Sequence, residues 1–330
     1  MPGVRSDNTA IYMKDSYKAA FKTYDKVETV FDKVYSVKTG VTGAGDKMTQ
    51  LIGAGPLERH LVEGQDIKFK SPVEGWAFYV RYWTYSDGLS FTKEASEDSI
   101  KFGNVIKEFA STWGEQQRVA EEEMAARPFN VGGATSGDWI LNGSHTGNSA
   151  PYGNMLYDNK PLFAVEGNEH TTKGGGTYYN SIASLDVTPG DFEKLYNLHT
   201  ATNNRNERDQ VVKNDADTIL TKPGSSYFKA WKLFNSNLLP GQDINDANPY
   251  KNLCNTVKWD YLTDTDPVFY IGKAKSDDFQ FHKRQNPEIR YYRHEPNVGY
   301  HASFNIRQGV LIKDFRVWSR GGGTSSATYA

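Results

Sequence analysis

Apolar side chains recur at a helical spacing near the start of the chain. Between residues 16 and 36 they stand three or four positions apart, a pattern typical of one face of an amphipathic helix. These apolar positions are Ala20, Tyr24, Val27, Phe31 and Val34. Five glycines follow between residues 39 and 56, and glycine permits many backbone conformations. The pattern therefore predicts a helical arm within residues 1–56 that ends in a flexible joint.

A second and longer helical pattern covers residues 97–127. Ser96 can cap its first turn, and one apolar stripe continues to Pro128, which is expected to end the helix. The stripe consists of Phe102, Val105, Ile106, Phe109, Trp113, Ala120 and Met124. At 1.5 Å per residue the helix would be about 45 Å long, far longer than a typical globular helix. We expect it to be the structural spine of its domain, with Phe109 and Trp113 buried against a sheet.

Between these two helices the pattern changes to a period of two, which is typical of strands. It runs from Ile67 to Phe91, and Ser86-Asp87-Gly88 is a turn signal. The pattern predicts a long β-hairpin over residues 67–96. Because an isolated two-stranded hairpin is only marginally stable in water, we expect its aromatic side chains to contact another surface. These side chains are Trp76, Phe78, Tyr79, Tyr82 and Trp83.

The rest of the chain mixes short helices and strands. After a loop-rich stretch, Thr188 and Pro189 can start a helix, and residues 225–234 have a helical pattern. Strand-like segments occupy residues 217–220, 256–259 and 268–271. Near the end, alternating apolar residues predict further strands. They are Tyr300, Ala302, Phe304 and Ile306, followed by Phe315 and Val317. The fold class is therefore α+β, with a Gly/Ser/Thr-rich tail that is expected to be disordered.

The composition limits the kind of partner. A length of 330 residues suggests about two domains. Lys and Arg number 38 against 40 Asp and Glu, so no strong electric field favours a polyanionic partner. The mean hydropathy is −0.66 and no apolar run approaches the ~20 residues of a membrane span, so we expect a soluble intracellular chain with no membrane partner. Aromatic residues make up 13% of the chain, which is typical when large rigid side chains serve contact surfaces as well as a core.

No residue pattern supports catalysis, a cofactor or a metal site. The seven histidines never stand four positions apart, the helical spacing that would place two imidazoles on one metal ion. Residues 143–147 have the outer glycines of a nucleophile elbow but His145 at the centre, where the nucleophile should be. We interpret Glu121-Glu122-Glu123 as a solvated helix face and Cys254 as a buried structural thiol. We therefore expect a protein that is not an enzyme and holds no cofactor.

The order of these elements resembles that of the Hong Kong 97-type major capsid proteins of tailed phages. The most specific agreement lies in the middle of the chain, which is similar to the Asp-Gly-x-Pro-Leu-Phe, His, Gly-rich, Asn run of Mu-like major head subunits. The matching residues are Asp158, Pro161-Leu162-Phe163, His170, Gly174-Gly175-Gly176 and Asn180. Asn159 replaces the usual Gly, and both residue types tolerate a left-handed turn.

The resemblance implies four parts. They are an N-terminal arm (residues 1–56), an extended hairpin or E-loop (67–96), a peripheral domain with the spine helix (57–66, 97–130 and 286–330) and an axial domain (131–285). In such proteins the hairpin lies on a neighbouring subunit. The five aromatic residues of the predicted hairpin would then be contacts between subunits. Some relatives carry a scaffolding segment ahead of the arm, for which the early start of the hairpin leaves no room.

The resemblance implies a structural major capsid protein. It would assemble into pentamers and hexamers that form an icosahedral shell around packaged double-stranded DNA. Its partners would be further copies of itself, packaged DNA bound non-specifically and, where they exist, decoration, scaffolding and portal proteins. It would belong to the virion after assembly in the host cytoplasm. Two alternatives fit the residues: another structural component of the head or tail, and a soluble hydrolase whose carboxylate site leaves little motif.

Overall fold

The computed structural model describes residues 18, 22–41, 45–52, 69, 73–92, 102–133, 158, 160–239, 246–263, 267–294 and 299–323. The chain divides into two compact units. The first unit consists of Met1–Ala44, Arg81–Ala126 and Phe281–Val310, and the second of Gly45–Val80, Arg127–Gln280 and Leu311–Ala330. Three long elements contribute residues to both units: α4 (Phe102–Val131), β11 (Ser276–His294) and β12 (Gly299–Ile312).

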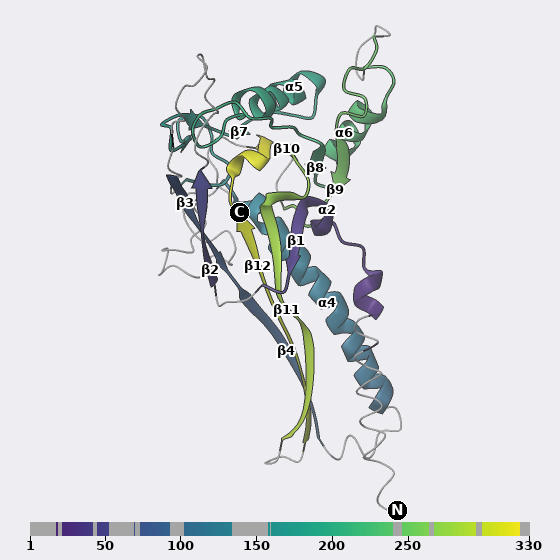
Figure 1. Cartoon of the computed structure of the whole chain (residues 1–330). Coiled ribbons are helices and arrows are strands. Elements are labelled where there is room, and N and C mark those ends of the chain that lie inside the picture. Colours follow the sequence, from purple (N-terminus) through teal and green to yellow (C-terminus); the bar gives the residue numbers. More distant parts are fainter. Residues whose placement is uncertain are drawn as a thin grey trace, which may run out of the picture. The chain divides into compact units, whose positions relative to one another are not determined.

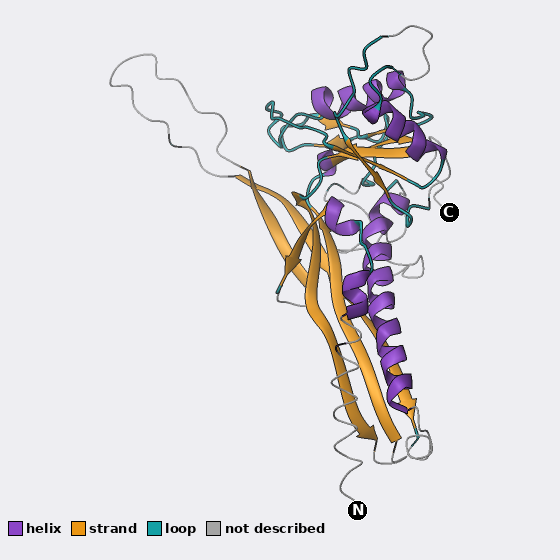
Figure 2. Cartoon of the chain, turned by 90° about the vertical axis from the view of Figure 1, so that its right-hand side faces the viewer, coloured by secondary structure: helices purple, strands orange, loops and turns teal. Residues whose placement is uncertain are grey.

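A four-stranded sheet lies beside α4 in the first unit (Figure 1). Its strand order is β1 (Tyr35–Thr39), β11, β12 and β4 (Trp83–Phe91), drawn in orange in Figure 2. Because side chains alternate along a strand, Ala302, Phe304 and Ile306 of β12 share one face, and they form a core with Trp113 of α4. The strict alternation in this part of the sequence predicted the strand, and the prediction is confirmed.

Trp113 is held on the buried side of α4, where the helical periodicity places it. Its ring stacks on Phe304 with 5.8 Å between the ring centroids, and its Nε1 donates a hydrogen bond to Asp87 Oδ2 at 2.7 Å. Phe109 differs from the expectation, because its side chain is 43% exposed. Ala110 is buried in its place. Successive residues are about 100° apart around a helix, so the buried stripe runs one position further round than the apolar pattern indicates.

α4 ends at Val131 and not before Pro128. Proline lacks a backbone N–H and removes one helical hydrogen bond, which is why the helix was expected to stop there. Packing in the second unit holds the extra turn, because Phe129 is completely buried in a cluster of aromatic rings. The rings around it belong to Phe163, Trp259, Tyr270, Phe279 and Trp318. The expected helix end was wrong because these contacts outweigh one missing hydrogen bond.

The N-terminal helical pattern is interrupted. Residues 22–26 are helical, and α2 (Phe31–Val34) is a separate helical turn. Glu122 of α4 explains the break. Its Oε1 accepts hydrogen bonds from the backbone N–H groups of Val30 at 2.5 Å and Phe31 at 3.3 Å, which caps the start of α2. The predicted flexible joint is wrong over Gly45–Ile52, because these residues form strand β2.

Within the described residues 73–92, the two strands of the hairpin predicted over residues 67–96 do not pair with each other. β3 (Val73–Arg81) pairs with β2, whereas β4 pairs antiparallel with β12. Asp87 and Gly88, which were expected to make the turn, lie inside β4. Gly88 does not adopt the positive φ that a tight hairpin turn requires. Turn residues permit a turn, but the distant strand with which β4 pairs determines its conformation.

The second unit is built on a five-stranded sheet. Its strand order is β7 (Ser181–Ile182), β13 (Trp318–Gly322), β10 (Val268–Gly272), β8 (Thr218–Thr221) and β9 (Asn255–Lys258). β10 is antiparallel to both of its neighbours, whereas β8–β9 and β7–β13 are parallel pairs. The predicted strands near residues 217, 256 and 268 are confirmed, each within one residue of its boundaries.

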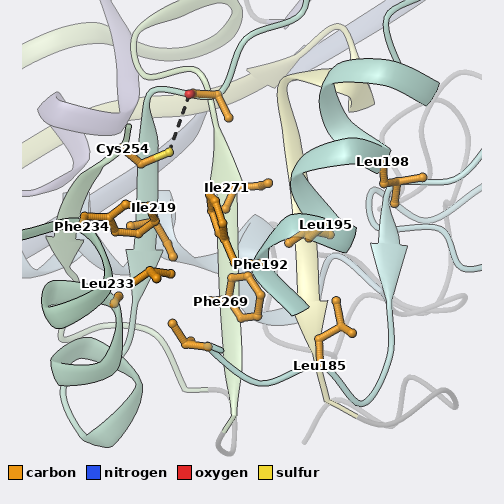
Figure 3. Close-up of a cluster of buried hydrophobic side chains, with 13 residues drawn as sticks. Leu185, Phe192, Leu195, Leu198, Ile219, Leu233, Phe234, Cys254, Phe269 and Ile271 are labelled. Carbon is orange, nitrogen blue, oxygen red and sulfur yellow. Dashed lines mark hydrogen bonds between the residues drawn. The ribbon is translucent and has the colours of Figure 1, made fainter. Parts of the chain in front are cut away.

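Both faces of β10 in this sheet are buried. α5 (Pro189–Asn197) and α6 (Ser225–Asn235) contribute to the hydrophobic cluster on the face that carries Phe269 and Ile271 (Figure 3). Tyr270 points to the other face, where its hydroxyl donates to the carbonyl oxygen of Phe129 at 2.9 Å. Both helices were predicted, and Thr188 caps α5 by accepting a hydrogen bond from Asp191 N. A short π-helix, Leu198–Thr202, follows α5.

The closing segment belongs to the second unit. β13 lies between β7 and β10, although the resemblance assigns residues 286–330 to the domain of the spine helix. A short 3-10 helix, Phe315–Val317, precedes it. Gly322 lies in β13 and not in a disordered tail, with φ at 93°. A Cβ atom there would lie 1.9 Å from the carbonyl oxygen of Pro267, so only glycine fits.

Candidate functional site

The residues that carry the resemblance converge in the second unit around the side chain of Asn180. This amide is completely buried. Its Oδ1 accepts a hydrogen bond from Ala164 N at 2.9 Å, and its Nδ2 donates to Leu162 O and Phe315 O, both at 2.9 Å. One side chain therefore joins the Pro-Leu-Phe segment to the residues that lead into β13. Because a buried amide without partners is costly, this position favours asparagine.

His170 packs next to this junction. It starts β5 (His170–Thr171), which pairs with β6 (Thr177–Tyr178). Its Nδ1 lies 2.9 Å from Asp158 Oδ2, and its ring stacks on Phe315 with 3.9 Å between centroids. Asp158 Oδ1 also accepts from Lys160 N at 3.2 Å, as in the turns that Asp side chains favour. Asp158 and His170 thus close the loop that contains the substituted position 159, which lies outside the described residues.

The glycines that follow, Gly174 and Gly176, allow the carboxylate of Asp209 to approach the backbone closely. Asp209 accepts hydrogen bonds from Thr172 Oγ1 at 2.7 Å, Gly176 N at 3.1 Å and the Tyr178 hydroxyl at 3.1 Å. A Cβ atom on Gly174 would lie 2.2 Å from Asp209 Oδ2, and one on Gly176 would lie 2.4 Å from Oδ1. The sequence reading missed Asp209, since its only signal was the glycine run that allows such a close approach.

A buried ion pair lies beside this loop. Arg316 Nη1 is 2.9 Å from Glu207 Oε1, and both side chains are buried. Glu207 Oε2 accepts a hydrogen bond from Trp76 Nε1 at 2.9 Å, and the ammonium group of Lys173 lies 3.7 Å from the centre of the Trp76 ring. These contacts fix β3 to its own unit. Trp76, which was expected to contact a neighbouring subunit, therefore has partners within its own unit.

The other predicted contact residues fall into three groups. Tyr82 is buried in the first unit, and its hydroxyl lies 3.0 Å from His282 Nδ1, so it is an internal residue and not a contact surface. Trp83 is half-buried at the start of β4. The side chains of Phe78 and Tyr79 lie outside the described residues. The structure therefore does not bring the five aromatic residues together on one hairpin.

A charged cluster fastens the N-terminal residues to α4 in the first unit. Glu121 is buried, and its carboxylate lies 3.0 Å from both Lys283 Nζ and the Tyr24 hydroxyl. The guanidinium of Arg118 lies 3.5 Å from the centre of the Tyr24 ring. Burial, together with the charge of Glu121, raises the pKa of Tyr24 above its usual value, and burial lowers the pKa of Lys283. The ion pair between Glu121 and Lys283 offsets part of the cost of burying the two groups.

The interpretation of residues 121–123 as a solvated helix face is wrong for Glu121 and Glu122, which are both buried. Only Glu123 is exposed. A cavity of about 340 Å³ lies beside Glu121, with Gln117 and Gln308 in its lining. The lining charges of Glu121 and Lys283 pair with each other, and Arg307 also lies in the lining.

The described residues offer few other candidates for a reactive group or a binding site. Cys254 is buried, its Sγ lies 3.7 Å from Ala216 O, and burial raises the pKa of its thiol to about 12, as expected of a structural thiol (Figure 3). Among the residues that the structure describes, no group of three His, Cys, Asp or Glu side chains could hold a metal ion. No helix in the described part of the chain is long and apolar enough to cross a membrane.

Comparisons with known proteins place this fold. No family model and no curated protein matches the sequence. Among solved structures, a chain of Gordonia phage Cozz is 12% identical, with a TM-score of 0.50 over 91% of this chain and 89% of that one. A chain from the capsid of the native GTA particle is 12% identical, with a TM-score of 0.52 over 89% and 91% of the two chains. A chain from the capsid of the empty GTA particle is also 12% identical, with a TM-score of 0.51 over 89% of this chain and 90% of that one.

At this level of identity the likeness concerns the fold and not the function. The similarity extends over about nine-tenths of both chains in each case, so it includes both units. The chain therefore has the mixed α+β fold of the tailed-phage major capsid proteins that its sequence resembles.

Proposed function

We propose that this chain is a major capsid subunit that assembles into pentamers and hexamers, and these into an icosahedral shell around double-stranded DNA. The observation that carries the proposal is the likeness to GTA capsid chains over nearly the whole length of both proteins. Such a role is structural and needs no catalytic group. It also fits a net charge of −2, because a shell that encloses DNA without binding it site by site needs no strong positive field.

We propose roles for the two units as well. The first, with the four-stranded sheet and most of α4, would be the peripheral domain, and the second would be the axial domain. The ribbon of β2 and β3 would take the role of the extended hairpin, in place of residues 67–96. Phe69, the described residue between these two strands, supports this assignment because its side chain is 96% exposed. A phenyl ring so exposed gains most from cover by another subunit.

A closer relation to Mu-like major head subunits is a further part of the proposal. Its support is that the matched residues form one connected group, in which Asp158 contacts His170 and Asn180 joins the Pro-Leu-Phe segment to Phe315. In this view the protein resides in the virion after assembly in the host cytoplasm. Portal, scaffolding and decoration proteins would meet the assembled shell.

The test is assembly of the purified full-length chain. Sedimentation velocity at micromolar concentration and physiological salt should show pentamers, hexamers or larger closed particles, and negative-stain images should show shells. A single monomeric species under these conditions would contradict the proposal. Purified particles should also contain this chain as their most abundant protein. A copy number of a few per particle would instead indicate a minor head or tail component.

A further inference from the structure

Two arginines lie on neighbouring strands of the four-stranded sheet, on the face that points away from α4. Side chains alternate between the two faces along a strand. Lys283 of β11 points toward α4, where it pairs with a carboxylate, so Arg284 points to the other face. Gln308 of β12 donates a hydrogen bond to a backbone carbonyl of α4, so Arg307 also points to the other face. We name Arg284 and Arg307 the arginine pair.

The positions of the two arginines along their strands bring them together. β11 and β12 are neighbours joined by a short connection, so they run antiparallel. Tyr292 of β11 stacks on His301 of β12, with 5.4 Å between the ring centroids, so these two residues are neighbours across the strands. Eight residues back along β11 and eight forward along β12 lie Arg284 and Gly309. Arg284 is therefore a diagonal neighbour of Arg307, and arginine side chains can span the ~7–8 Å between such positions.

Both guanidinium groups of the arginine pair lack an acceptor. Arg284 Nη1 and Arg307 Nε are shielded from solvent, and neither has a hydrogen-bond partner in the part of the chain that the structure describes. Glu288, four residues after Arg284, is already held by Arg290 Nε at 2.6 Å. A shielded donor without an acceptor is costly, and guanidinium groups keep their charge. The arginine pair therefore favours an anion that comes from outside these residues.

The surroundings of the arginine pair hold it in place and leave it within reach of solvent. The guanidinium carbon of Arg284 lies 5.5 Å from the centre of the buried Tyr82 ring. Thr84 of β4 stands opposite Arg307 in the register and is exposed, whereas both arginines are half-buried. The hydroxyl group of Thr84 is a further donor next to the pair. An ion from solution can therefore reach the pair and contact three neighbouring strands.

The donors of this site match a phosphate group better than a carboxylate. Each guanidinium group presents several N–H donors in a planar fork that fits phosphate oxygens two at a time. A phosphate group carries nearly two negative charges at neutral pH and has at least three acceptor oxygens, so it can satisfy both arginines at once. A carboxylate has a single charge and two oxygens, and it would leave one of the two arginines unmatched.

We propose that the arginine pair is a binding site for a phosphate group, with Thr84 as a further donor. The bound group would link β4, β11 and β12 on the face opposite α4 and would neutralise the two arginines. The proposal does not depend on the proposed capsid function, because it concerns groups within one chain. Two sources carry this chemistry, inorganic phosphate in solution and the backbone of DNA, and the test separates them.

The test measures the affinity of the full-length chain for inorganic phosphate by calorimetric titration, with the ionic strength held constant by chloride. The parent should bind phosphate, and the double variant Arg284→Gln, Arg307→Gln should bind it at least about tenfold more weakly, because charge-assisted hydrogen bonds are lost. Arg290→Gln is the matched control and should keep the affinity of the parent, since Arg290 already has a carboxylate partner. A parent that does not bind phosphate, or equal binding by the parent and the double variant, would overturn the proposal.

Circular dichroism checks that the double variant folds. If it does not fold, Arg307→Lys replaces it, because lysine keeps the charge but lacks the planar fork of donors. Arg307→Lys should still bind phosphate more weakly than the parent, and unchanged affinity would contradict the site.

Two further titrations identify the source of the phosphate group. A short DNA duplex that displaces phosphate from the parent, and binds the double variant more weakly, would support the site and assign it to the DNA backbone. A duplex that does not displace phosphate would support the site and assign it to free phosphate. Acetate that binds the parent as tightly as phosphate would overturn the choice of phosphate and indicate a carboxylate ligand.

Discussion

At the scale of single residues, some side chains have the surroundings that the sequence pattern predicts and others do not. Glu121 and Glu122 look like part of a solvated acidic run, yet their partners are Tyr24, Val30 and Lys283, far away in the chain. No local pattern encodes such partners. Cys254 shows the opposite case, because a lone cysteine in an apolar segment needs only burial, and the interpretation of the sequence was correct. The burial of Cys254 could be predicted from its local sequence, whereas pairing between distant polar residues could not.

Trp113 provides the first prediction at this scale. Trp113→Ala should lower the free energy of unfolding by about 3–5 kcal/mol, because it leaves a cavity against Phe304 and removes the hydrogen bond to Asp87. Urea unfolding of the unassembled chain measures the change. Phe109→Ala is the control on the same helix, and it should change the free energy of unfolding by less than about 0.5 kcal/mol. Equal effects of the two substitutions would contradict the assignment of the buried stripe.

His199 provides a prediction about pH. The imidazole is buried, its Nδ1 lies 2.9 Å from Ser319 Oγ, and burial lowers its pKa from 6.5 to about 4. The unfolded chain therefore binds a proton near pH 6.5 that the folded chain does not, so stability is highest above pH 6.5 and falls as the pH drops toward 4. The loss from this group should be on the order of 3 kcal/mol.

His199→Asn tests this assignment, because asparagine can keep one hydrogen bond but does not titrate. The thermal midpoint of the parent should fall more steeply between pH 6.5 and 4 than that of His199→Asn. A slope that is unchanged in His199→Asn would show that His199 does not govern acid stability.

At the scale of elements, the local period of the sequence predicted those strands and helices that have a strong apolar pattern of their own. α5, α6, β8, β10 and β12 belong to this group. β2 and β4 do not, because their glycines and Asp87 are equally compatible with a loop or a turn. Their strand conformation comes from pairing, and the partner of β4 is β12, more than 200 residues later. The sequence therefore indicates where strands can form, but it does not indicate which strands pair with each other.

The ribbon of β2 and β3 gives a prediction at this scale. Replacing residues 46–79 with a short Gly/Ser linker should leave α4 and both larger sheets intact by circular dichroism, because none of their strands is removed. The variant should not form closed shells, since the ribbon is proposed to lie between subunits. Normal shells in negative-stain images would contradict that role. A matched variant with the same linker in place of residues 83–90 should unfold the first unit, because it removes β4.

At the scale of the whole molecule, the prediction of an α+β fold with a long spine helix was correct, and the division into parts needed revision. The closing segment was expected beside the spine helix, but β13 lies inside the sheet of the second unit. Its short strand, with Gly321 and Gly322, has the composition of a tail. Only the contacts of β7 and β10 on either side reveal it as an interior strand.

Truncation tests the importance of β13. A chain that ends at Ile312 lacks this strand, and it should lose hydrogen-exchange protection in β8 and β10, because the middle of their sheet is open. A chain that ends at Gly323 should keep the protection of the parent. Equal protection in both chains would show that β13 is dispensable for the second unit.

The position of β13 also has a consequence for biosynthesis. The side chain of Asn180 donates hydrogen bonds to the carbonyl groups of Phe315 and Trp318, which lie 135 and 138 residues later in the chain. These bonds can form only after those residues have been synthesised. The ribosome therefore has to make almost the entire second unit before its central sheet can close, and folding that depends on such distant contacts is slow. During this interval the strand edges of β7 and β10 are unpaired and prone to aggregate. Yields of soluble protein should therefore rise when chaperones are supplied, since they can cover these edges until the last strand has been made.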